Sequence, residues 1–69
     1  MTFAEIRKEK RFTQEALAEK IGVSQSAIAA WETGVAVPTV KNLMLASKVL
    51  DVDVSTLANA IERTNKKTE

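Results

Sequence analysis

Hydrophobic residues recur along this chain at helical spacing. Leu17 and Ile21 lie four residues apart, as do Leu57 and Ile61, and Ile28 precedes Trp31 by three. Residues three or four apart share one face of an α-helix, so each pair indicates a helix with one buried face. The β-branched run at 35–40 contains a proline and has no second run to pair with. The pattern therefore predicts an all-α fold without strands.

Cap residues and glycines divide this pattern into five short helices. Thr2 and Glu5 have the spacing of a capping box, and Gly22 and Gly34 are suited to left-handed helix ends. Later helix starts are predicted directly after Thr13, Ser24, Thr39 and Asp53. The expected helices cover residues 3–10, 14–21, 25–33, 40–50 and 54–63. We expect one domain over residues 1–64 and a flexible tail over 65–69.

The residue types that are missing narrow the chemistry. The 69 residues include no cysteine and no histidine. The chain therefore has no disulfide, no thiolate metal site, and neither the commonest metal ligand nor the commonest general base. We expect no metal, no cofactor and no enzymatic activity. Stability has to come from helix packing, with dimerisation as a further source.

Charge by itself indicates little. The net charge is +1, lower than in many nucleic-acid-binding domains. Basic residues cluster near the start and in the tail, and solvated helix faces are the simplest interpretation of both clusters. The charged N-terminus does not resemble a signal peptide, and no apolar run reaches membrane-spanning length. We expect a cytoplasmic protein with no membrane partner.

The stretch TQEALAEKIGVSQSAIAAWETG, residues 13–34, contains two helices joined by a very short turn. Such helices cross steeply and pack closely, which suits the small Ala18 and the positive φ available to Gly22. The outward face of the second helix is polar or small and lacks acidic residues: Gln25, Ser26, Ala29, Ala30 and Thr33. A helix that enters the DNA major groove needs such a face, and a glutamine amide suits the edge of adenine.

This stretch resembles the Cro/cI-type repressors, also called the xenobiotic-response-element helix-turn-helix family. The matching motifs are TQEALAEKIGVSQSAI, then W-E-x-G, a proline, and KVLDVDVS-x-L, so the resemblance extends from Phe3 to about Ile61. It implies a lambda-repressor-like fold that inserts the helix at 25–33 into the major groove. Two departures stand out. Ala29 and Ala30 occupy places where many members carry Arg or Lys, and Arg11 stands where a glycine commonly ends the first helix.

The resemblance assigns roles to particular residues. Base reading is expected from Gln25, Ser26 and Ala30, and Arg7 and Glu32 are expected to form a structural ion pair. The resemblance also implies that Gln14 touches a phosphate and braces Gln25. Further phosphate contacts are expected at Ser24, Thr33 and Lys41. A merely solvated side chain is an equally good interpretation of Lys41.

Two functions fit these residues. The first is a sequence-specific transcriptional regulator, most simply a repressor, which binds a double-stranded DNA operator as a homodimer, with Ile61 as one possible dimer contact. The alternative is a protein-interaction or antitoxin-like module on the same fold. The low net charge and the Ala29/Ala30 pair favour that alternative modestly. An exposed apolar patch on the last helix, together with no affinity for any DNA duplex, would support it.

Overall fold

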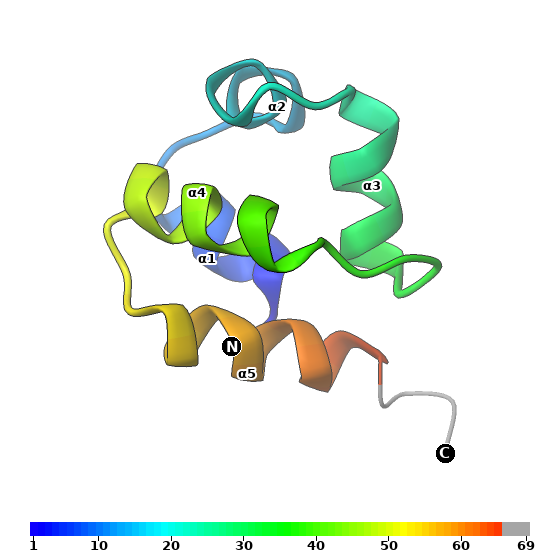
Figure 1. The fold of residues 1–69 in the computed structure, drawn as a ribbon, viewed down its shortest axis with the longest axis vertical. Coiled ribbons are helices and arrows are strands. Elements are labelled where there is room, and N and C mark those ends of the chain that lie inside the picture. The colour runs from blue at the N-terminus through cyan, green and yellow to red at the C-terminus, as the bar shows by residue number, and fades with distance from the viewer. Residues whose placement is uncertain (66–69) are drawn as a thin grey trace.

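The computed structural model describes residues 1–65, with side chains to residue 62. Helices are the only regular elements in this range, so the predicted all-α class is confirmed. The five helices are α1 (Phe3–Glu9), α2 (Gln14–Ile21), α3 (Gln25–Thr33), α4 (Val40–Leu50) and α5 (Val54–Asn65). In Figure 1, α2 lies at the top, α3 stands upright at one side, and α5 runs along the bottom.

Four helices begin at the predicted caps. The Oγ1 atom of Thr2 accepts a hydrogen bond from the amide of Glu5, and the Glu5 carboxylate accepts one from the amide of Thr2 at 2.8 Å. Thr13, Ser24 and Thr39 each accept a hydrogen bond from the backbone amide three residues ahead. These bonds satisfy amide groups that the first helical turn leaves unpaired.

Helix ends depart slightly from expectation. The first helix stops at Glu9, with Lys10 as its C-cap. The last helix continues to Asn65, two residues beyond the predicted end at Arg63. No glycine or proline lies between residues 54 and 65 to stop it. Asn65 therefore belongs to α5 rather than to the expected tail, and residues 66–69 lie outside the described part of the chain.

Left-handed backbone ends several helices. Gly22 and Gly34 adopt positive φ after α2 and α3, as predicted. Arg11 also has a positive φ, of 68°, in the turn between α1 and α2. This turn is closed by a hydrogen bond from the amide of Phe12 to the carbonyl oxygen of Arg7, 3.1 Å long. The family resemblance leads one to expect a glycine at this position. Its backbone is indeed left-handed, although an arginine occupies it.

Side chains from all five helices form one core. The largest fully buried members are Phe3, Leu17, Ile28, Leu50 and Leu57. The rings of Phe3 and Trp31 meet edge to face, with centroids 6.0 Å apart, so Trp31 packs α3 against α1. Ile61 is only 6% exposed and packs in the same core. It is therefore unavailable as a dimer contact, because its position on α5 turns it inward with Leu57.

Candidate nucleic-acid interface

A tight turn sets the angle between α2 and α3. Gly22 has φ 92° and ψ 31°, and its amide donates to the carbonyl oxygen of Ala18 at 2.8 Å. The amide of Val23 donates to the same oxygen at 3.0 Å. Ala18 is buried and carries only a methyl group. The chain therefore turns within three residues and sends α3 away from α2 as a separate, steeply crossing helix.

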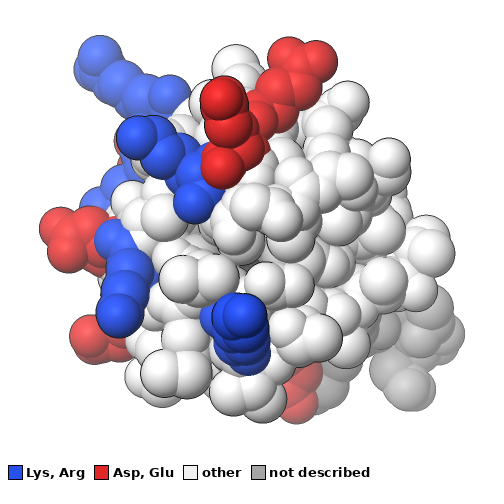
Figure 2. All heavy atoms as spheres, turned by 45° about the horizontal axis from the view of Figure 1, so that its top comes forward, with Lys and Arg blue, Asp and Glu red and all other residues white. Residues whose placement is uncertain are grey.

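α3 has one buried face and one accessible face. Ile28 and Trp31 point into the core. The outward face predicted from the sequence is accessible along its length: Gln25, Ser26 and Thr33 are exposed, and Ala29 and Ala30 are half-buried. The single charged residue of α3 is Glu32, whose side chain is only 8% exposed. In Figure 2 the surface on the side of α3 is largely free of charge, and most charged side chains gather elsewhere on this view.

Arg7 and Glu32 are in contact inside the molecule. The Nε atom of Arg7 donates to Oε2 of Glu32, and its Nη2 atom donates to Oε1 at 3.3 Å. The remaining terminal nitrogen, Nη1, donates to the carbonyl oxygen of Phe12 at 2.7 Å. The two side chains that the resemblance pairs therefore tie together α1, α3 and the turn before α2.

Gln14 extends this contact to the surface. Its Nε2 atom donates to Oε1 of Glu32 at 2.8 Å. Its Oε1 atom accepts a hydrogen bond from Nε2 of Gln25 at 2.9 Å. We call the series Arg7–Glu32–Gln14–Gln25 the polar relay. The resemblance predicts the Arg7–Glu32 and Gln14–Gln25 pairs of this relay, but nothing in the sequence predicts the bond between Gln14 and Glu32, because residues 18 apart on different helices leave no periodic signal.

The expected phosphate-binding residues are not equally free. Ser24 is exposed, and its Oγ atom accepts a bond from the amide of Ala27, which leaves the hydroxyl hydrogen available. Lys41 is exposed in the first turn of α4. Thr33, in contrast, donates its hydroxyl hydrogen to the carbonyl oxygen of Ala30 at 3.3 Å. Thr33 therefore faces outside mainly as an acceptor, which suits an anionic phosphate poorly.

Four large hydrophobic side chains are exposed where α3 connects to α4. Val35 is 81% exposed and Val40 73%, and Val37 and Met44 are about half exposed. We call Val35, Val37, Val40 and Met44 the α3–α4 apolar surface. Lys41 and Lys48 flank a shallow groove beside it. An exposed apolar surface therefore exists, but its main members lie on the α3–α4 connection and α4 rather than on the last helix.

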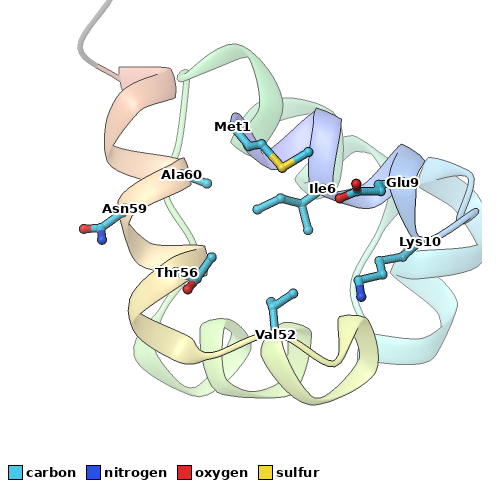
Figure 3. Close-up of a pocket in the computed structure, with 8 residues that line it drawn as sticks. All are labelled: Met1, Ile6, Glu9, Lys10, Val52, Thr56, Asn59 and Ala60. Atoms are coloured by element: carbon cyan, nitrogen blue, oxygen red, sulfur yellow. The ribbon is translucent and has the colours of Figure 1, made fainter.

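A second hollow lies between α1 and α5. It measures about 380 Å³, and Ile6, Val52 and Ala60 are among its lining residues (Figure 3). Asn59 points away from it in this view. None of the site residues expected from the sequence lines it. Within residues 1–65 no group of three potential metal-ligating side chains occurs, and no helix there is long and apolar enough to cross a membrane.

Comparisons with known proteins agree with this geometry. A family model described as helix-turn-helix matches residues 3–57. The chain is 38% identical over 58 residues to the HTH-type transcriptional activator BcrR of Enterococcus faecalis, a match that covers 84% of this chain and 28% of the relative. It is 39% identical over 51 residues to the uncharacterized HTH-type transcriptional regulator YqaE of Bacillus subtilis (strain 168), covering 74% and 44%. The chain thus spans less than half the length of either relative. No solved structure matches it significantly.

Proposed function

This chain belongs to the helix-turn-helix family, and from that premise we propose that it is a sequence-specific DNA-binding transcriptional regulator that inserts α3 into the major groove. The observation that carries the proposal is the division of α3 into two faces. Its outward face is accessible, uncharged and polar at the N-terminal end, while its one carboxylate is turned inward onto Arg7. A carboxylate on the outer face would repel phosphates, so this arrangement suits DNA.

The proposed contacts divide into base reading and positioning. Gln25 and Ser26 read base edges, and the Ala30 methyl group contacts a thymine methyl. Ser24, Gln14 and Lys41 hold the phosphate backbone, helped by the N-terminus of α3. Thr33 contributes least, because its hydroxyl hydrogen is engaged by Ala30.

Two copies are proposed to bind one operator, as a homodimer in the cytoplasm. Paired helices of this type reach half-sites one helical turn, or about 34 Å, apart. Ile61 lies in the core, so the contact between copies has to involve other residues. The proposal includes no enzymatic step, metal or cofactor, because positioned hydrogen bonds to DNA are sufficient for its action.

Replacing Gln25 with alanine tests the base-reading role. We expect the Gln25→Ala variant to bind the operator with an affinity lower by about 1–3 kcal/mol, and to lose preference at one base pair of each half-site. The measurement is selection from a randomised duplex pool for both proteins, followed by titration against the selected and scrambled duplexes at two salt concentrations.

Lys41→Met is the matched control. It is expected to weaken binding to all sequences without changing the selected sequence. The slope of the logarithm of the binding constant against the logarithm of the salt concentration should fall in magnitude by about 1. An unchanged sequence preference in Gln25→Ala would remove Gln25 from the reading mechanism. Binding by the unmodified protein that is equal for selected and scrambled duplexes would contradict the proposed function itself.

Between repression and activation, we favour repression. Occupying a site that overlaps a promoter is enough to block transcription, whereas activation needs a further productive contact. One relative is named an activator, so the distinction needs a direct test. Transcription in vitro from a promoter that overlaps the selected operator should fall as the protein is added, and a rise would reverse this part of the proposal.

The α3–α4 apolar surface favours one alternative function, a protein-interaction or antitoxin-like module on the same fold. Its exposed valines, Val35 and Val40, bring no hydrogen-bonding groups to DNA. A chain that binds no duplex in the selection experiment, but whose association with a protein is lost in Val40→Lys, would support this alternative.

A further inference from the structure

The hydrogen bonds of the polar relay all run the same way: Gln25 donates to Gln14, and Gln14 donates to Glu32. A carboxylate only accepts hydrogen bonds, so Gln14 must turn its NH2 group towards Glu32. The oxygen of Gln14 then faces Gln25 and must receive a donor. Gln25 accordingly directs Nε2 to Gln14, over a distance of 2.9 Å. The negative charge of Glu32 thus sets the orientation of two successive side-chain amides, the second of which is exposed.

Arg7 holds the Glu32 carboxylate in place, so the carboxylate stays oriented towards Gln14. The guanidinium contacts both carboxylate oxygens and is held in turn by the carbonyl oxygen of Phe12. The side chains of Arg7 and Glu32 are only 9% and 8% exposed. Rotating the amide of Gln14 would place its oxygen against a buried carboxylate, and rotating Gln25 alone would place two amide oxygens together. Neither arrangement contains a hydrogen bond at the altered contact.

The orientation determines what Gln25 can offer to DNA. One of its two N–H groups is occupied by Gln14, which leaves one donor and the amide oxygen for a base. Adenine presents one acceptor, N7, and one donor, its N6 amino group, in the major groove. Guanine presents two acceptors, N7 and O6, so the outward oxygen of Gln25 would face O6 without a hydrogen.

From this geometry we infer that Glu32 is a positioning residue: acting through Gln14, its carboxylate makes Gln25 read adenine and reject guanine. The inference rests on the proposed function, since it concerns the base pair that Gln25 contacts. It assigns a specificity-determining role to Glu32, a buried residue that is not itself on the outward face of α3.

Changing Glu32 to glutamine should exchange the donors and acceptors along the polar relay from residue 32 to Gln25. The guanidinium of Arg7 only donates, so its Nε atom, which makes the shorter contact, retains the remaining oxygen of the new side chain. The new NH2 group then takes the place of Oε1, where it faces Gln14 and gives up the longer bond from Nη2 of Arg7. Gln14 then has to present its oxygen to that group and its NH2 group to Gln25. Gln25 accepts through its oxygen and turns both N–H groups outward, which matches the two acceptors of guanine.

The experiment measures dissociation constants for two operators that differ only by A·T or G·C at the pair read by Gln25. The unmodified protein should prefer adenine by about 5- to 150-fold, the range of one good bidentate pair. Glu32→Gln should reduce this ratio below about threefold or invert it. Gln14→Met removes the middle of the relay while leaving the ion pair intact, and it should also bring the ratio below about threefold.

Lys41→Met serves as the affinity control, because it should weaken both complexes equally and preserve the ratio. Circular dichroism verifies that each variant is folded. If Glu32→Gln fails to fold, Gln14→Met decides alone. An adenine preference retained by the folded variants would overturn the inference, as would an unmodified protein that selects guanine at this pair. The proposed function would survive either result, since it fails only if the unmodified protein shows no sequence preference.

Discussion

At the scale of single residues, Arg7 and Glu32 connect stability to the reading surface. Their side chains are buried and hydrogen-bonded to each other, and each has a further partner: Phe12 for Arg7 and Gln14 for Glu32. Removing two charges from water is costly, and only good geometry offsets this cost. The pair is therefore more valuable as a fixed attachment between α1 and α3 than as a source of net stability.

Removing only one member of the pair should be severe. In Arg7→Met the Glu32 carboxylate stays buried and retains only Gln14. We expect the free energy of unfolding to fall by about 3–5 kcal/mol, which is enough to leave much of a domain of this size unfolded. Circular dichroism and urea denaturation measure the loss. The double variant Arg7→Met/Glu32→Met should recover most of this loss, since no buried charge is left unpaired. A loss below about 1 kcal/mol in the single variant would mean that the pair behaves like an exposed one.

At the scale of elements, the connections decide how the helices meet. Gly22 permits a left-handed turn, and a Cβ added there would meet no atom within 4 Å, so its requirement is conformational rather than steric. Arg11 adopts the same kind of backbone with a side chain present. Left-handed conformation costs a residue with a Cβ about 1–2 kcal/mol. The α1–α2 turn therefore carries a cost that the α2–α3 turn avoids.

Arg11→Gly should relieve that cost. We expect the free energy of unfolding to rise by about 0.5–1 kcal/mol, because the backbone relief exceeds the entropy that glycine adds to the unfolded chain. The melting temperature should rise by about 2–8 °C in a chain of this size. Arg11→Ala is the control, since it removes the side chain but keeps the Cβ. Equal stabilisation by both variants would trace the effect to the side chain instead.

At the scale of the whole molecule, one small core supports all five helices. A domain of this size gains only about 3–5 kcal/mol from such a core. The core has members from every helix, among them Phe3 from α1 and Leu57 from α5. Loss of one large side chain should therefore affect the entire fold, including α3, rather than loosen one helix.

Leu57→Ala tests this dependence. Leu57 is fully buried, and its truncation is expected to cost about 2–5 kcal/mol, which leaves much of the protein unfolded at 25 °C. Circular dichroism and urea denaturation measure the loss. Val54→Ala, on the same helix at a position 41% exposed, should change stability by less than about 0.5 kcal/mol. Similar effects of the two substitutions would show that α5 is not integrated into the core.

The sequence was most informative where the cause is local. Thr2, Thr13, Ser24 and Thr39 act on amides three residues ahead, and the helices they open begin where predicted. It was less informative about the end of α5, because no glycine or proline marks that end. The helix continues to Asn65, past the predicted end at Arg63. Ile61 has helical spacing from Leu57, but periodicity does not distinguish a core contact from a contact with a second copy.

By itself, the sequence determined the five helices, the N-caps of the first four and the composition of the outward face of α3, because each depends on neighbours a few residues away. The resemblance added the Arg7–Glu32 pairing. Only the tertiary structure decided that Gln14 bonds to Glu32, that Ile61 is buried, and that Val35 and Val40 remain exposed. These outcomes depend on which helices pack against each other. That packing is driven by the burial of apolar side chains that lie far apart in the chain.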